Sequence, residues 1–72
     1  MMIEDAIRDW LRKLFVEQQE VNRYEAQLAK AIDPSQIIWL QQKIREHRNE
    51  GAIYMGLILK QLYRIARQPL TG

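Results

Sequence analysis

The sequence predicts an all-α fold: a two-helix antiparallel hairpin with coiled-coil-like packing, which associates with a second copy into a four-helix bundle. Three observations predict it. Apolar residues repeat every seven positions, one strong helix-start signal divides the chain, and two helices leave further apolar residues uncovered. With 72 residues, three glycines, two prolines and no cysteine, the chain has few turn formers and forms one domain, residues 1–72. A core of this size is marginal unless a disulfide, a metal or oligomerisation supports it.

The helix-start signal lies at residues 32–37, where the sequence reads Ile-Asp-Pro-Ser-Gln-Ile. Asp33 suits the N-cap, because its carboxylate can accept the free amide hydrogens of a first helical turn. Pro34 suits the first helical position, where its missing N–H costs nothing. Gln36 would complete a capping box, and Ile32 and Ile37 hold the positions of a hydrophobic staple. We therefore predict that a second helix begins at Pro34.

The expected first helix covers about residues 2–31, followed by a turn at 32–33. The second helix covers about 34–67, and Pro69 opens a short tail, 68–72. A seven-residue apolar repeat indicates left-handed, coiled-coil-like packing of the two helices. The predicted inner rows are Ile7, Leu14, Val21, Leu28 and Trp10, Glu17, Tyr24, Ala31 in the first helix, and Ile37, Ile44, Gly51, Ile58, Ile65 and Leu40, His47, Tyr54, Gln61 in the second.

A short connection makes the two helices antiparallel neighbours. The charges favour this arrangement, because acidic residues of the first helix then lie level with basic residues of the second. The alternative is one long helix kinked at Pro34, although an interior proline costs ~3 kcal/mol or more. The expected pairings are Glu4, Asp5 and Asp9 with Lys60, Arg64 and Arg67, and Glu20 and Glu25 with Lys43, Arg45 and Arg48.

Several large apolar residues, such as Val16, Ile38 and Trp39, lie off the inner rows. Exposed together, such residues would form a patch larger than a monomer normally carries. Two hairpins packing into a four-helix bundle would cover it. We therefore expect a homo-oligomer, with a dimer favoured and another protein as the alternative partner. The predicted interface residues are Leu11, Phe15, Leu57, Leu59, Leu62 and Tyr63.

A polar layer interrupts the inner rows halfway along the hairpin. Glu17 and His47 lie on the rows, and Glu20 and Glu50 lie one turn away. In a dimer, such groups could hold two metal ions, as in ferritin-like bundles with Glu-x-x-His motifs. Here the order is reversed, because His47 precedes Glu50. We expect an ion-pair layer that fixes the register of the helices, with no metal and no cofactor. The second alternative function is that of a di-metal oxidase with these residues as metal ligands.

A basic cluster consists of Lys43, Arg45 and Arg48. The chain is similar in length and hairpin form to Rop, a small plasmid copy-control protein, and this resemblance implies RNA binding as the first alternative function. The formal charge is only +2, from 11 basic against nine acidic residues. This balance requires neither nucleic acid nor an anionic membrane as a partner, so nucleic acid is not favoured.

No hydrolytic site is expected. Ser35 and His47 would lie about three turns apart on one helix, too far apart for a catalytic triad. The acidic start at Glu4 and Asp5 is unlike a signal peptide, and the longest apolar block, 52–59, is far shorter than a membrane span. The sequence predicts a cytoplasmic, non-catalytic subunit without membrane contact: an adaptor, a regulator or a component of a larger assembly. A phage or plasmid origin stays open.

Overall fold

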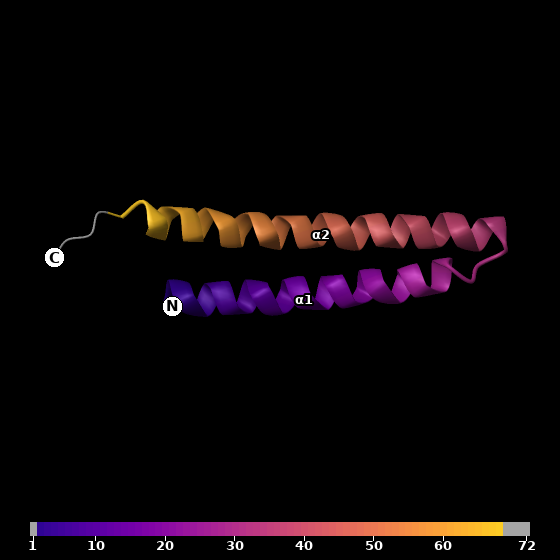
Figure 1. Ribbon diagram of the computed structural model, residues 1–72, viewed down its shortest axis with the longest axis horizontal. Coiled ribbons are helices and arrows are strands. Elements are labelled where there is room, and N and C mark those ends of the chain that lie inside the picture. Colours follow the sequence, from indigo (N-terminus) through magenta and orange to yellow (C-terminus); the bar gives the residue numbers. More distant parts are fainter. Residues whose placement is uncertain (1, 69–72) are drawn as a thin grey trace.

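The computed structural model describes residues 2–68, which form two long helices lying side by side and antiparallel (Figure 1). Helix α1 covers Ile3–Leu28, and helix α2 covers Pro34–Ala66. The hairpin measures 62 × 17 × 16 Å, which is the shape of a single helical pair. The all-α hairpin is therefore confirmed, and the alternative of one extended kinked helix is wrong. The predicted stop at Pro69 lies outside the described residues. Within those residues, neither helix has a stretch long and apolar enough to cross a membrane.

Helix α1 ends at Leu28, three residues earlier than predicted. The amide of Lys30 donates to the carbonyl of Gln27 at 3.1 Å, and the amide of Ala31 donates to that of Leu28 at 3.2 Å. These bonds join residues three apart, so the chain tightens beyond the regular helix and satisfies its last carbonyls. The connection therefore covers residues 29–33 rather than 32–33. Helix α2 ends at Ala66, one residue before the predicted position.

The start of α2 confirms Asp33 as the N-cap and Pro34 as the first helical residue. An Asp33 carboxylate oxygen accepts a hydrogen bond from the Ser35 amide at 3.2 Å. The capping box and the hydrophobic staple are both wrong. In this described segment no hydrogen bond joins the Gln36 side chain to Asp33, and the Asp33 carboxylate bonds to the Ser35 amide instead of that of Gln36. Ile32 is 90% exposed and therefore does not pack as a staple.

This cap geometry has a measurable consequence for stability. Asp33→Ala should lower the free energy of unfolding by about 1 kcal/mol without changing the fold, because the Ser35 amide loses its acceptor. Gln36→Ala is the matched control and should change stability little. Urea denaturation of both variants at one protein concentration measures the difference. An equal loss from Gln36→Ala would show that the capping box forms after all.

The predicted inner rows face each other and form the core. Four apolar side chains are buried, those of Val21, Leu40, Ile44 and Ile58. Buried Gly51 marks the close approach of the helices, since a Cβ added there would lie 3.4 Å from Leu14 Cδ1. The other described members of the rows are partly buried, except Ile65, which is exposed. The heptad prediction is therefore confirmed for all of the inner rows but this last position.

The core is unevenly distributed along the hairpin. Val21, Leu40 and Ile44 lie in the half nearest the connection, here called the turn half. The half that contains the start of α1 and the end of α2, here called the open half, has only Ile58 among the buried apolar side chains. The two helices therefore hold each other most firmly near the connection.

The ion pairs confirm part of the predicted charge pattern. Arg48 forms an ion pair with Glu25 across the two helices. At the open half, Asp9 instead pairs with Lys13 of its own helix at 2.9 Å, four residues along the chain. The hydrogen bond and the negative charge of Asp9 raise the pKa of Lys13 above its ordinary value. Among the described residues, no ion pair within 4.0 Å joins Glu4, Asp5 or Asp9 to Lys60, Arg64 or Arg67, so the expected proximity of these charges produces no direct contact.

Candidate interaction surface and polar layer

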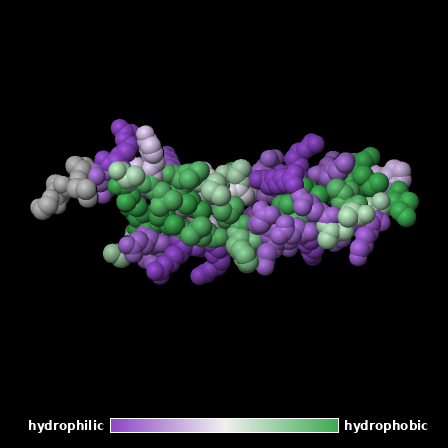
Figure 2. Space-filling view, in the orientation of Figure 1, coloured by the Kyte–Doolittle hydropathy of each residue, from purple (hydrophilic) through white to green (hydrophobic). Residues whose placement is uncertain are grey.

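The outer surface of the open half is strongly apolar. Figure 2 shows hydrophobic residues gathered over this half and mostly hydrophilic residues over the turn half. In the described chain, fifteen large hydrophobic side chains are exposed, against the four that are buried. The part of this apolar surface that gathers over the open half is typical of a protein–protein contact, since a monomer rarely carries a large contiguous apolar patch.

One side of the hairpin carries the largest part of this surface. Leu11 and Phe15 lie one turn apart on α1, and Met55, Leu59 and Leu62 follow one another at spacings of four and three on α2. Such spacings place the residues of each helix on one side. We call these five residues the open-half face; their exposed fractions range from 43% to 62%.

A shallow groove adjoins the open-half face along α2. It is lined by Gly56, Leu59, Lys60, Leu62, Tyr63 and Ala66. Gly56 leaves it open, since a Cβ added there would meet no atom within 4 Å. Five of the six predicted interface residues therefore lie on the open-half face or in its groove.

Leu57, the sixth predicted interface residue, lies elsewhere. It is two positions from both Met55 and Leu59, and a helix turns about 200° over two residues. Leu57 therefore lies on the opposite flank of α2. Its exposed fraction is the lowest among the exposed large hydrophobic side chains. Sequence reasoning grouped Leu57 with Leu59 and omitted Met55, although the spacing of four between Met55 and Leu59 marks them as neighbours.

In the polar layer, Glu17 and His47 lie in contact. His47 Nδ1 is 2.5 Å from Glu17 Oε2, and the two side chains are 25% and 19% exposed respectively. An ionised carboxylate only accepts hydrogen bonds, so the Nδ1–H of His47 donates to Glu17. The bond joins α1 to α2 at one level and therefore opposes sliding of one helix along the other.

Aromatic stacking extends the layer in a way that the sequence did not indicate. The Tyr24 ring stacks on the His47 ring, with centroids 5.6 Å apart. The Tyr24 ring also contacts the Trp39 ring, in an edge-on arrangement with centroids 5.7 Å apart. Trp39 belongs to neither inner row, and the heptad pattern therefore gave no signal for this contact.

The other two predicted members of the layer do not join Glu17 and His47. Glu20 pairs with Arg23 at 2.5 Å, and this hydrogen bond and its charge raise the pKa of Arg23 above its ordinary value. Glu50 is exposed on α2; it lines a shallow pocket together with Glu17 and His47 but forms no ion pair or side-chain hydrogen bond with either of these described residues. Within residues 2–68, no group of three or more histidine, aspartate or glutamate side chains is arranged to hold a metal ion.

The contact between Glu17 and His47 should stabilise the hairpin measurably. A double-mutant cycle with Glu17→Ala and His47→Ala should give a coupling energy of about 1 kcal/mol, because each single change removes the same hydrogen bond. Denaturation curves for the four proteins measure this coupling. Additive losses would contradict the contact.

Adding zinc, iron or manganese ions should leave the melting temperature of the protein unchanged. A ligand that binds only the folded state must raise the melting temperature, so a clear rise would show that the polar layer binds metal.

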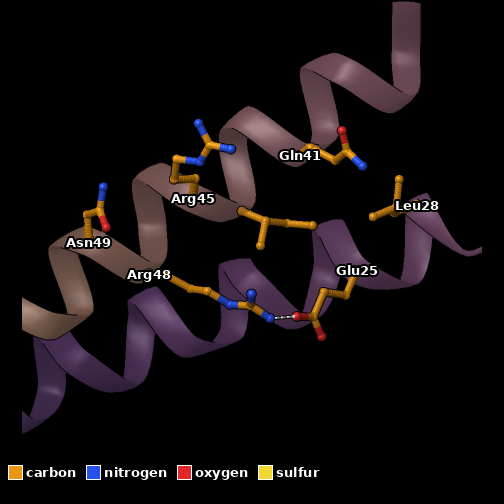
Figure 3. Close-up of a pocket in the computed structure, with 7 residues that line it drawn as sticks. Glu25, Leu28, Gln41, Arg45, Arg48 and Asn49 are labelled. Carbon is orange, nitrogen blue, oxygen red and sulfur yellow. Dashed lines mark hydrogen bonds and ion pairs between the residues drawn. The ribbon is translucent and has the colours of Figure 1, made fainter. Parts of the chain in front are cut away.

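The predicted basic cluster is divided between two sides of α2. Lys43 lies over the Trp39 ring, 5.7 Å from its centroid, and pairs with Glu46. Arg45 and Arg48 instead line a second groove in the turn half. Figure 3 shows this groove, with Gln41 and Asn49 on the same helix and Glu25 bound to Arg48. No carboxylate among the described residues lies within 4.0 Å of the Arg45 guanidinium.

Comparison with protein-family models, with curated proteins and with solved structures gives no match to this chain. The surfaces described above are therefore the features of the molecule that point to a function.

Proposed function

We propose that this chain is a small, non-catalytic structural or interaction subunit that works as an oligomeric helical hairpin. The observation that carries the proposal is the apolar open-half face. Its side chains are about half exposed in the single chain, and the hairpin itself buries only a small apolar core among the described residues. The natural first assembly is a homodimer that forms a four-helix bundle. In this form the chain serves as an adaptor, a regulator or a component of a larger assembly.

The free energy gained by burying the open-half face is similar in size to the free energy lost on association. Full burial of a Leu, Met or Phe side chain contributes roughly 1.5–3 kcal/mol. The five residues are already about half buried, so two copies together gain roughly 7–15 kcal/mol. Association costs an estimated 4–15 kcal/mol in lost freedom. A dimer therefore needs nearly all of these residues.

Sedimentation equilibrium and circular dichroism across one dilution series test the proposal. We expect a dimer mass at micromolar concentration, and a joint fall of mass and helix content on dilution. The two signals fall together because the open half has little core of its own. A wild-type chain that stays monomeric and fully helical at micromolar concentration would contradict self-association.

A second candidate function is nucleic-acid binding, favoured by the groove of the turn half. Arg45 and Arg48 line this groove together with Gln41 and Asn49. Guanidinium and amide groups are the side chains that most often contact phosphates and base edges. Glu25 neutralises Arg48, however, so that of the two arginines in this groove only Arg45 is without a carboxylate within 4.0 Å among the described residues. Self-association therefore remains the preferred proposal.

Binding measurements at several salt concentrations separate the two candidates. If the groove is only a solvated surface, RNA and duplex DNA should bind weakly and without preference at physiological salt. Sub-micromolar binding would establish the second candidate, provided that Arg45→Gln lowers the steepness of its salt dependence. Arg12→Gln, an exposed arginine of α1 away from the groove, is the matched control.

A further inference from the structure

We infer that the second copy packs on the open-half face with its connection pointing in the opposite direction, so that only the open halves overlap. This inference rests on the proposed self-association and adds the arrangement of the two chains. It follows from the way in which apolar and polar residues are divided along one side of the hairpin.

On this side of the hairpin, the apolar residues of the open half are followed by polar residues nearer the connection. On α1, the spacing that joins Leu11 and Phe15 leads on to Gln18, Asn22 and Glu25. Gln18 donates a side-chain hydrogen bond to Asn22 at 3.0 Å. On α2, the residues that precede the apolar stripe are Gln41, Arg45 and Arg48, and the exposed Ile38 follows beyond them at the same spacing.

The two stripes lie on the same side of the molecule. The ion pair between Glu25 on α1 and Arg48 on α2 joins them in the turn half. Figure 2 shows the corresponding change from hydrophobic to hydrophilic surface along the hairpin. A partner can therefore cover the open half of this side without covering its turn half.

A two-fold axis along the hairpin would place the two connections at the same end. The two turn halves would then face each other, and the polar groups of both would lose water. Each chain would contribute Arg45 and Arg48 but only one carboxylate, Glu25, which is already paired. Burial of unmatched charges is costly, so this arrangement is disfavoured.

A two-fold axis across the middle of the hairpin would overlap the chains along their full length. Each open-half face would then lie on the turn half of the other copy. Leu59 and Leu62 would lie against polar residues such as Gln41 and Arg45. This arrangement covers the apolar face but desolvates polar groups without giving them partners.

An axis across the open half removes both problems. At the level of Leu11, between Met55 and Leu59, it places the open-half face of one copy on that of the other. Helix α2 then packs against α2 of the second copy through Met55, Leu59 and Leu62. The two turn halves project on either side, with their grooves open to solvent.

Distances between labels at the connection distinguish the three arrangements. The chain has no cysteine, so Ser35→Cys gives one exposed labelling site and preserves the backbone amide that Asp33 caps. From the helical rise per residue, the two labels should be roughly 65 Å apart when only the open halves overlap. Full overlap gives roughly 50 Å. Connections at the same end give less than about 30 Å, the width of a bundle with its labels.

The control site is Arg12→Cys, on the exposed side of α1 in the open half. Its labels should be less than about 30 Å apart in all three arrangements, and they show that the measured species is the dimer. For Ser35→Cys, a separation near 65 Å supports the inference, and either shorter separation overturns it. A monomer mass by sedimentation, with no distance between chains, would instead reject the self-association on which the inference rests.

Discussion

Leu59→Glu should convert the oligomer into a monomer and largely unfold it. Leu59 lies on the open-half face and also lines the adjoining groove, and its side chain is more than half exposed in the single chain. A carboxylate at this position would be desolvated by the apolar side chains of the second copy, and the burial of a charge is costly. The separated hairpin would retain only its small core, which is too little for a chain of this length.

Two further variants make the effect of Leu59→Glu specific. Leu59→Ala removes apolar area without adding charge and should weaken association less. Gln42→Glu adds the same charge on the exposed surface of the turn half and should change little. Sedimentation equilibrium gives the mass of each variant, and circular dichroism gives its helix content. If Leu59→Glu remained a helical dimer, the open-half face would not be the dimer interface.

Leu40→Ala should lower the free energy of unfolding by roughly 2–5 kcal/mol, which is the usual cost of truncating a buried leucine. Leu40 is 0% exposed and is the one fully buried large side chain among the described residues. The cavity would lie in the turn half, where three of the four buried apolar side chains are found. A loss of this size is a large part of the stability of a small domain.

Ile38→Ala is the matched control for this substitution. Ile38 is two residues from Leu40 on the same helix, and 59% of its surface is exposed. Its truncation should cost less than about 0.5 kcal/mol, as for surface changes in general. Urea denaturation at one fixed protein concentration compares the two. Equal losses would mean that Ile38 is also buried in solution, by a partner that covers the turn half.

The residues that predicted the fold act locally or repeat regularly. Asp33 and Pro34 set the start of α2 through their own backbone geometry, and the seven-residue rows identified Leu40 and Ile44 as inner positions. The predicted end of the first helix and the predicted hydrophobic staple were wrong, because local contacts at the connection decide both features. The early end of α1 follows from tight hydrogen bonds at residues 29–31, which no sequence period indicates, and it leaves Ile32 exposed in the connection.

The residues of the candidate sites could be predicted from the sequence, but which of them contact one another could be predicted only in part. Glu17 and His47 were expected in one layer, and they form a hydrogen bond. The stacking of Tyr24 on His47 could not be predicted, because it depends on side-chain rotamers as well as helix register. Leu57 was assigned to the same surface as Leu59, although rotation about the helix axis places the two on different sides.

The uneven distribution of the core has a consequence for the order of folding. Contacts near the connection close short loops, which cost less chain entropy than the closure of long ones. The same contacts bury Leu40 and Ile44. We therefore expect the helices to zip together from the connection outward and the open half to form last. The second copy then arrives where folding is least complete, so that assembly is also the final step of folding for each chain.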